Sequence, residues 1–335
     1  MYHQAKERGE EVKVFVTGAT GFIGRRLVER LHREGSEVIA LVRNECHGLP
    51  QGVRATRGDV RVPDSLGECG LGCDRLYHLA AIITFDPRRR DELLRVNGQG
   101  TASVLSLARH WNVRRTVIVS SACTVGLSYA KDHVLDEESP LAAGLAESNP
   151  YLESKLATER AALAAARDQA VVVVNPTTMY GPGDWTLNSG TLLLKIARSK
   201  VMPIPPGGGN VVDVDDVVEG ILAAGERGQS GHRYVLGGEN LSFAQIFHTI
   251  AEVVHHQPLF VPLPRWMRGP TATAAWAAGR VIGSRFLTPQ IVGDLFAFKY
   301  YSSRRAKQEL RWASQFSFRQ SVERAWEFYR QEGLA

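Results

Sequence analysis

The fold is decided by residues 12–34, VKVFVTGATGFIGRRLVERLHRE, which hold a short apolar run, a glycine-rich turn and an amphipathic segment. The run 12–16 is mostly β-branched and apolar, which is typical of a buried parallel strand. Apolar residues then recur at helical spacing from Phe22 to Glu34, and Gly35 follows where a helix C-cap is expected. The sequence therefore predicts a strand, a tight turn and a helix in direct succession.

The glycines of this turn, Gly18, Gly21 and Gly24, have the spacing that a dinucleotide requires. The turn must be tight, the backbone must approach a pyrophosphate closely, and the last glycine must let helix and strand pack. The pyrophosphate then lies on the free N–H groups of the helix N-terminus. A tight turn without a ligand is the alternative, but the place between a buried strand and an amphipathic helix favours the phosphate site.

The alternation of strand and helix continues along the chain. Further strands are expected at 38–42, 53–57, 75–79, 116–120 and 171–175, and helices at 89–110 and 151–167. This order predicts an α/β fold with a doubly wound parallel sheet of the Rossmann type. We expect a dinucleotide-binding domain over 12–176, to which 211–238 returns, and a smaller helix-rich C-terminal substrate lobe from 177–210 and 239–335.

Composition excludes several classes of protein. The 335 residues are 44% hydrophobic and 22% charged, as in a globule with a substantial core. A net charge of +5, from 40 basic and 35 acidic residues, is too small to indicate a nucleic-acid partner. The four cysteines lack the spacing of a metal site, so we expect no metal and a reducing, cytoplasmic location. The polar N-terminus and the absence of a long apolar stretch predict no transmembrane segment.

The end of the second strand bears on which dinucleotide is bound. An NAD-binding chain usually carries an acidic residue there for the ribose 2′-hydroxyl, but this strand ends Leu41-Val42-Arg43-Asn44. Arg43 could pair with a 2′-phosphate, which favours NADP(H) over NAD(H). A solvated Arg43 in an enzyme that accepts either cofactor is the alternative. After the third strand, Asp59 either contacts the adenine amino group or caps the next short helix.

A tyrosine and a lysine, Tyr151 and Lys155, occupy one face of the helix expected at 151–167. A carbonyl that receives hydride must also gain a proton, and a phenol near an ammonium has a lowered pKa that suits this transfer. Ser120 and Ser121 end the fifth strand, and either hydroxyl could bond the substrate oxygen. The pattern predicts an acid/base site for hydride chemistry.

These segments together resemble the extended short-chain dehydrogenase/reductase superfamily. The resemblance covers residues 12–238 and rests on TGATGFIG, the Gly58-Asp59-Val60 turn, Leu79-Ala80-Ala81, Asn97, the double serine, YLESK, and Asn175-Pro176 through Gly183. Within it, VNPTTMYGPGD and RYVLGGENLSFAQI resemble the dihydroflavonol 4-reductase-like group, which includes the hopanoid-associated sugar epimerases.

The resemblance implies roles for individual residues. It assigns catalysis to Ser121, Tyr151 and Lys155, with Asn97 helping to hold a proton-relay water. From the residues alone, Asn97 is a mid-helix asparagine, and the flanking Gly98 and Gly100 predict a local helix break. The glycine-rich turn, the Arg43 argument and the resemblance together give the expected cofactor-binding residues: Gly18, Thr20, Gly21, Phe22, Ile23, Gly24, Arg43, Asp59, Val60, Leu79, Ala80, Ala81, Tyr151, Lys155, Asn175 and Pro176.

Two positions depart from the nucleotide-sugar members. Asn210 stands where an arginine often clamps the diphosphate, and Asp213 stands where His or Tyr is more usual. We therefore expect an NAD(P)(H)-dependent oxidoreductase that reduces a ketone, or oxidises a secondary alcohol, of an apolar small molecule. A nucleotide-sugar epimerase or dehydratase is the first alternative, and a non-catalytic dinucleotide-binding sensor is the second.

The remaining features allow more than one interpretation. His78 is expected to be a structural histidine within its strand. The aromatic-rich stretch 266–301 is predicted to pack in the core of the small lobe. An alternative is that part of it lines an apolar pocket for the substrate. A second alternative is that the same stretch rests weakly on a membrane surface, where lipid phosphates would face Arg265, Arg268, Arg280 and Arg285. The helices at 89–110 and 151–167 could pair in a homodimer, by analogy with relatives.

Overall fold

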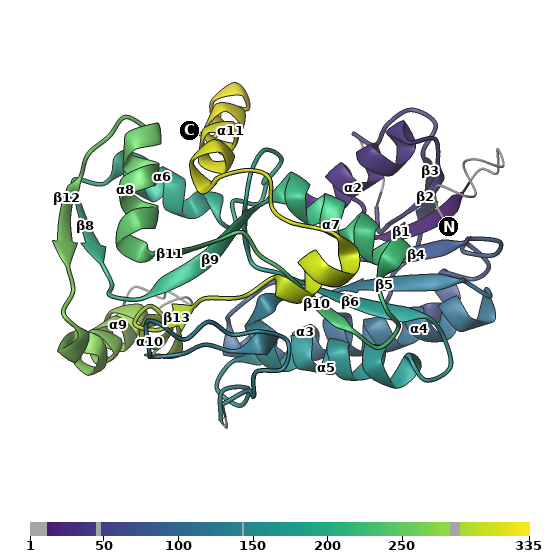
Figure 1. Cartoon of the computed structure of the whole chain (residues 1–335), viewed down its shortest axis with the longest axis horizontal. Helices are drawn as coiled ribbons and strands as arrows, with labels where there is room; N and C mark the ends of the chain where they lie inside the picture. The colour runs from purple at the N-terminus through teal and green to yellow at the C-terminus, as the bar shows by residue number, and fades with distance from the viewer. Residues whose placement is uncertain (1–11, 45–47, 143, 282–288) are drawn as a thin grey trace.

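A seven-stranded parallel sheet forms the centre of the molecule, a computed structural model that describes residues 12–44, 48–142, 144–281 and 289–335 (Figure 1). The strand order is β10-β6-β5-β4-β1-β2-β3, which confirms the predicted doubly wound α/β fold. The strands are β1 Lys13–Thr17, β2 Glu37–Val42, β3 Arg54–Arg57, β4 Arg75–His78, β5 Arg115–Val119, β6 Val171–Pro176 and β10 Arg233–Leu236.

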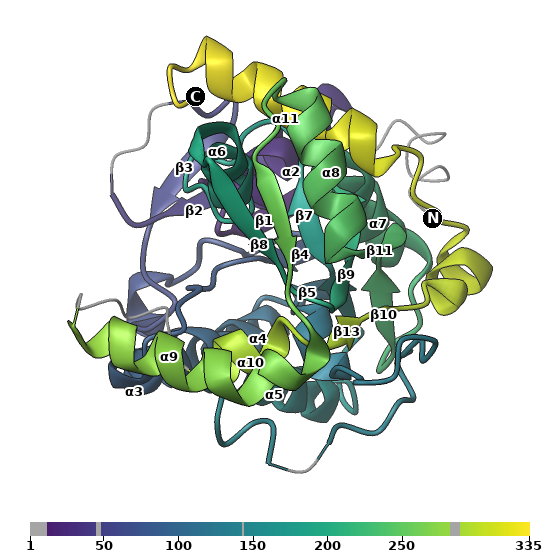
Figure 2. The same cartoon turned by 90° about the vertical axis from the view of Figure 1, so that its left-hand side faces the viewer.

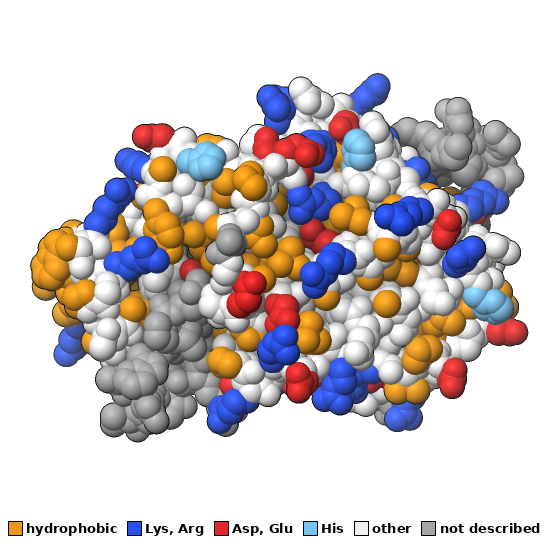
Figure 3. Space-filling view, turned by 90° about the horizontal axis from the view of Figure 1, so that it is seen from below, with side chains coloured by type: hydrophobic (Ala, Val, Ile, Leu, Met, Phe, Trp, Pro, Cys, Tyr) orange, Lys and Arg blue, Asp and Glu red, His pale blue; other side chains and the backbone are white. Residues whose placement is uncertain are grey.

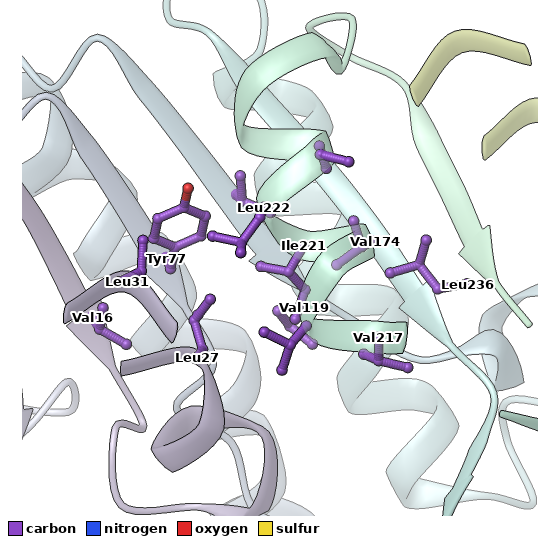
Figure 4. Packing of buried hydrophobic residues seen from close by; sticks show 14 of the residues in the cluster. Val16, Leu27, Leu31, Tyr77, Val119, Val174, Val217, Ile221, Leu222 and Leu236 are labelled. Atoms are coloured by element: carbon purple, nitrogen blue, oxygen red, sulfur yellow. The ribbon is translucent and has the colours of Figure 1, made fainter. Parts of the chain in front are cut away.

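Side chains alternate between the two faces of this sheet, as strand geometry requires. On one face, Val14 and Val16 of β1 share a core with α2 (Phe22–Arg33) and α7 (Val214–Arg227). Figure 4 shows Leu27 and Leu31 of α2 and Ile221 and Leu222 of α7 in this core. On the opposite face, Phe15 packs with residues of α4 (Gly100–His110) and meets the Trp111 ring edge-on, with a centroid distance of 5.2 Å. Both faces are therefore covered in the middle of the sheet, which explains why β1, β2, β5 and β6 are largely apolar, whereas the edge strand β3 is mostly exposed.

The helix expected at 89–110 is broken near its middle. The chain forms a 3-10 turn η2 (Pro87–Arg89), α3 (Arg90–Leu93), a π-helical segment η3 (Leu94–Gln99) and then α4. The glycines beside Asn97 explain the break: a Cβ on Gly98 would lie 3.2 Å from the Ala157 Cβ, and one on Gly100 would lie 2.9 Å from the Val60 Cγ2. The small residues thus let this segment approach α5 (Pro150–Ala165) closely.

The remaining elements form two smaller sheets and the helices around them (Figures 1 and 2). Strands β7, β9, β11 and β13 pair in one sheet, and β8 pairs with β12 in the other. Leu193, Ile196, Ile250 and Val322 belong to a second core, which α6, α8 and α11 share. The bounds are β7 Thr178–Tyr180, α6 Gly190–Arg198, β8 Val201–Ile204, β9 Gly208–Asp213, β11 Glu239–Ser242, α8 Phe243–Val253, β12 Leu259–Pro262, α9 Arg268–Val281, α10 Pro289–Asp294, β13 Phe298–Lys299 and α11 Phe318–Gln331. Short helices are η1 Pro63–Ser65, η4 Ala122–Val125, η5 Arg265–Met267 and η6 Ala306–Leu310.

Two segments that follow strands of the smaller sheets in the chain pack against the central sheet. After β9, the chain forms α7 on one face of the central sheet and then β10 at its edge. Leu310 of η6 and Trp312 also pack against this face, and the Trp312 indole donates to the Asp216 carbonyl at 2.8 Å. In the described part of the chain, no helix is both long enough and apolar enough to cross a bilayer.

Candidate active site at the carboxyl ends of the strands

The glycine-rich turn is packed so closely that side chains would not fit at two of its positions. Gly18 has a φ of +71°, and a Cβ there would lie 2.6 Å from the Ala80 backbone nitrogen. A Cβ on Gly24 would lie 2.0 Å from the Gly18 carbonyl oxygen. Helix α2 begins without a side-chain cap and without an acidic residue in its first turn. The turn thus fits the pyrophosphate of a dinucleotide, because its N–H groups and the helix dipole favour an anion.

The residues that follow this turn lie at the start of α2, where the expected cofactor contacts should be. Thr20 is exposed, and its carbonyl accepts a bond of 3.1 Å from the Arg25 guanidinium. Phe22 and Ile23, the first residues of α2, are half-buried. These side chains are therefore accessible to a molecule held at the helix N-terminus.

The ends of β2 and β3 place a cation and a carboxylate near each other. Arg43 is exposed directly after β2, and no ion pair joins it to another residue that the structure describes. Asp59 follows β3, and Arg61 is bound to its carboxylate at 2.5 Å. This bond, with a smaller contribution from Arg43, lowers the pKa of Asp59. Val60 is buried against Gly100. Arg43 is thus free to meet a ligand, while the Asp59 carboxylate already has a partner.

The end of β4 is fixed by a buried histidine. His78 bonds Thr17 Oγ1 at 2.7 Å and Thr101 Oγ1 at 3.0 Å, and burial lowers its pKa to about 3. The Thr17 hydroxyl also accepts a bond from the Ala80 N–H at 3.2 Å. A neutral His78 therefore has the predicted structural role, since it holds the Leu79-Ala80-Ala81 segment against the glycine-rich turn. Ala81 is exposed at this edge.

Tyr151, Lys155 and Ser121 come together between α5 and β5. Asn149 caps α5 by accepting from the Leu152 N–H at 3.1 Å, which places Tyr151 in the first turn. The Tyr151 ring lies edge-on to Phe85 with a centroid distance of 5.7 Å, and Ser121 lines the same cavity as Tyr151. The buried Lys155 ammonium donates to the Val119 carbonyl at 3.1 Å. The structure thus brings the three side chains together at the junction of α5 and β5, and their role as an acid/base site stays a prediction.

The ionisation of this group differs from the sequence-based expectation. Burial raises the pKa of Tyr151 well above its usual value, and the Ser121 side chain opposes this only in part. Burial also lowers the pKa of Lys155 to about 8, while the negative charge of Glu159 raises it. The expected lowering of the Tyr151 pKa by Lys155 is therefore wrong for this structure, because desolvation dominates. The phenol is a protonated donor at neutral pH.

A buried carboxylate, which the sequence analysis missed, connects the strand ends beneath this group. Oε1 of Glu159 accepts from Ser120 Oγ at 2.7 Å, Thr124 Oγ1 at 2.7 Å and Asn175 Nδ2 at 2.5 Å. Its Oε2 accepts from the Arg233 guanidinium at 3.0 Å. The signal was present, since Glu159 follows Lys155 by four residues and therefore lies on the same helix face.

This network separates the two serines. The Ser120 hydroxyl donates a hydrogen bond to the Glu159 carboxylate, whereas Ser121 lines a cavity. Asn175 donates to the Ser121 carbonyl at 3.1 Å, and its own Oδ1 is buried without a partner among the described residues. Pro176, the next residue, lines the cavity. The end of β6 therefore supports the segment that carries Ser121.

Asn97 connects the π-helical segment to its neighbours. Its side chain accepts from the Ile82 N–H at 2.9 Å and donates to the Ile82 carbonyl at 3.0 Å and to Ser154 Oγ at 2.9 Å. The hydroxyls of Thr101 and Thr158 donate to its backbone carbonyl. These contacts give Asn97 a positioning role, and its part in a proton relay stays a prediction.

A cavity of about 210 Å³ opens beside Tyr151 and Ser121. Phe85, Leu127, Leu145, Leu152 and Tyr301 supply apolar walls. Lys299 is the only cation among the described lining residues, and its ammonium lies 3.6 Å from the Asp294 carboxylate. The cavity is therefore largely apolar, and its single pair of lining charges is balanced.

The two positions that depart from the nucleotide-sugar pattern have structural roles. Asn210 is buried and exchanges bonds with Thr177, Gly238 and Asn240, so its amide groups are already used. Asp213 caps α7 by accepting from the Asp215 N–H, and Arg324 lies 2.8 Å from its carboxylate. Neither side chain supplies a cation to the cavity.

The aromatic stretch 266–301 divides into two parts. Phe296, Phe298, Tyr300 and Tyr301 are buried, which confirms core packing there, and Tyr301 also reaches the cavity. Trp266 is exposed. Phe286 and Arg285 lie outside the described residues, as do the side chains of Trp276 and Arg280. The described residues hold no cluster that could bind a metal, and Cys69, Cys73 and Cys123 are free thiols, whereas Cys46 lies outside the described part.

Comparison with known proteins identifies the family. The chain belongs to the NAD dependent epimerase/dehydratase family, whose model matches residues 14–237. It is 32% identical over 313 residues, 88% of either chain, to a protein of Synechocystis sp. named as a dihydroflavonol 4-reductase. It is 33% identical over 265 residues, 76% of this chain and 78% of the other, to sterol demethylase protein B of Methylococcus capsulatus. The structure of MoeE5 in complex with UDP-glucose and NAD matches with a TM-score of 0.74 at 26% identity, covering 96% of this chain and 99% of that one.

Membership confirms the resemblance to extended short-chain dehydrogenases/reductases. The family uses a nicotinamide dinucleotide for oxidoreductase or epimerase chemistry, and such a cofactor supplies or removes hydride when bound. The residues that would hold it are those of the glycine-rich turn and of the strand ends described above.

Proposed function

We propose that this protein reduces the carbonyl group of an apolar small molecule, or oxidises the corresponding secondary alcohol, with NADP(H) preferred to NAD(H). The carrying observation is the cavity, where the hydroxyls of Ser121 and Tyr151 meet apolar walls and a charge-balanced Lys299–Asp294 pair. The relatives named as a reductase and as a sterol demethylase protein agree with an apolar substrate.

The chain's own residues can perform the proton side of the reduction. Tyr151 is protonated at neutral pH and can give its proton to the carbonyl oxygen as hydride reaches the carbonyl carbon. The Ser121 hydroxyl can donate a hydrogen bond to the same oxygen while negative charge develops there. Solvent then returns a proton to the phenolate that remains, while the Lys155 ammonium, on the same helix face as Tyr151, stays bound to the Val119 carbonyl.

The preference for NADP(H) rests on the end of β2. No acidic side chain follows the strand, and Arg43 is exposed there. A guanidinium binds a 2′-phosphate with charge-assisted hydrogen bonds, whereas it offers less to a 2′-hydroxyl.

A nucleotide-sugar epimerase is the second candidate, and the MoeE5 complex with UDP-glucose favours it. Its substrate would bring a diphosphate into a cavity whose described cation is already paired. Burying such charge without a free partner is costly, and the buried Asn210 does not supply one.

The test is a substrate panel that contains apolar ketones of graded size, UDP-glucose and UDP-galactose, each assayed with NADPH and with NADH. We expect NADPH oxidation with at least one apolar ketone, and a kcat lowered about 10²–10⁴-fold in Tyr151→Phe. Tyr129→Phe, which removes a hydroxyl outside the cavity, is the matched control. Epimerisation of a UDP-sugar without net cofactor consumption would overturn the proposal, and full activity of Tyr151→Phe would remove Tyr151 from the chemistry.

A further inference from the structure

The two-stranded sheet of β8 and β12 carries apolar side chains on its outer face. The register pairs Leu259 with Val201 and Val261 with Pro203. Leu259 is 66% exposed, Val201 55% and Val261 41%, whereas Phe260 and Met202, which alternate with them, pack against the second core. A sheet with one face in solvent usually carries polar side chains there, so this apolar outer face is unusual.

Trp266 extends the apolar surface beyond the end of β12. It lies in η5 and is 75% exposed, the largest value among the exposed large hydrophobic residues that the structure describes. We call Val201, Pro203, Leu259, Val261 and Trp266 the outer patch. Figure 2 faces this end of the molecule and shows β8 and β12 in front, with α9 beside them. Exposed apolar side chains gathered on one face of a small sheet and on the turn that follows it indicate an interaction surface.

The segments that carry the outer patch contain basic residues and no acidic ones. Asp and Glu are absent from 185–212 and from 253–293, whereas these two segments contain seven Lys and Arg residues. Because the net charge of the whole chain is +5, the rest of it is net negative. Lys200 and Arg265 immediately precede Val201 and Trp266, and both are exposed. Figure 3 shows blue side chains around the orange surface at this end.

We propose that the outer patch docks this protein on the surface of an anionic lipid bilayer. The apolar side chains would enter the region between headgroups and acyl chains, and the basic residues would meet lipid phosphates. Tryptophan favours this interfacial depth because its ring is apolar and its N–H is polar. A second copy of the chain fits poorly, since two such faces would bring like charges together.

The position of the outer patch connects docking with the cavity. Helix α9 follows the patch in the chain and packs against α10, whose Asp294 lines the cavity with Lys299 of β13. A docked molecule would thus hold its cavity near the lipid in which an apolar substrate dissolves. The docking itself does not depend on the proposed reaction, and its test involves no catalysis.

The experiment is co-sedimentation of the full chain with vesicles of phosphatidylcholine alone and of phosphatidylcholine mixed with phosphatidylglycerol. We expect binding to the anionic vesicles, and weaker binding at high salt. The double variant Trp266→Ser/Leu259→Ser should bind roughly tenfold or more weakly, because it removes two apolar side chains from the interface. Lys200→Gln/Arg265→Gln should lose roughly fivefold for each charge.

The matched control is Trp185→Ser/Leu71→Ser, which removes the same residue types from exposed positions (47% and 41%) outside the outer patch. It should bind as the unmodified chain does. Absence of binding to anionic vesicles, or equal loss in the control and the patch variants, would overturn the proposal. So would a fall in solution mass of the patch variant by light scattering, since the patch would then join two copies. If the serine variant fails to fold by circular dichroism, the charge variant decides the question, with the single change Lys200→Gln as its check because Arg265 also lies over the Phe298 ring.

Discussion

The buried carboxylate of Glu159 offers the sharpest test of how the site is held together. Glu159→Gln keeps the shape of the side chain and removes its charge. The amide oxygen can still accept from donors at Oε1, but its NH₂ group then faces the Arg233 guanidinium, which Oε2 now binds at 3.0 Å. Breaking a buried ion pair by removing one partner costs roughly 3–5 kcal/mol. We expect the lower end of this range, about 3 kcal/mol, because the Arg233 side chain is 22% exposed and can be partly solvated when its partner is removed.

The same change should alter the pH dependence of catalysis. Burial lowers the pKa of Lys155 to about 8, and Cys123 and the charge of Glu159 oppose this in part. Without that charge, the Lys155 pKa falls further, so the ammonium is lost at lower pH. The alkaline limb of kcat/KM for reduction should therefore move to lower pH in Glu159→Gln.

Two measurements check these expectations: urea unfolding followed by circular dichroism, and kcat/KM across pH. Glu153→Gln is the control, because Glu153 lies on the same helix but pairs with the half-exposed Arg90, where an ion pair contributes at most about 1 kcal/mol. A double variant Glu159→Gln/Arg233→Gln should regain part of the lost free energy of unfolding. The alkaline limb of its kcat/KM profile should stay at the lower pH. If Glu159→Gln had the same free energy of unfolding and the same alkaline limb of kcat/KM as the unmodified chain, the reasoning would be refuted.

Three further predictions concern the site and the assembly. Ser121→Ala should lower kcat for reduction by about 10²-fold while Ser120→Ala retains most activity, since Ser121 alone of the two lines the cavity; the reverse ranking in steady-state kinetics would exchange their roles. Arg43→Ala should remove most of the preference for NADPH over NADH in a binding titration, a difference of roughly 1.5–3 kcal/mol, and equal affinities in the unmodified chain would refute the preference. A homodimer through α4 and α5 should dissociate in Leu163→Arg, which charges an exposed apolar position on α5; light scattering would show the mass halved, and a monomeric unmodified chain would end this prediction.

Local sequence patterns were sufficient for six of the seven strands of the central sheet and for the glycine-rich turn. Apolar runs predicted the inner strands, because a strand buried on both faces must be apolar along its length, whereas for the edge strand β10 only the return of residues 211–238 was expected. The tight turn at Gly18 and Gly24 could be predicted for a similar reason. Where two backbone segments are in close contact there is no room for a Cβ, so only glycine fits. Tyr151 and Lys155 could be paired because helical geometry puts residues four apart on one face.

Tertiary structure decided what depends on residues distant in the chain. Glu159 acquires its role from Arg233, 74 residues away, and His78 from Thr17, 61 residues away. The pKa of Tyr151 was misjudged because the depth of burial is set by neighbours from other elements, not by Lys155 alone. The apolar outer face of β8 and β12 likewise follows from strand register and from which side meets the second core. Periodicity fixes which residues share a face of an element, but only packing decides what that face meets.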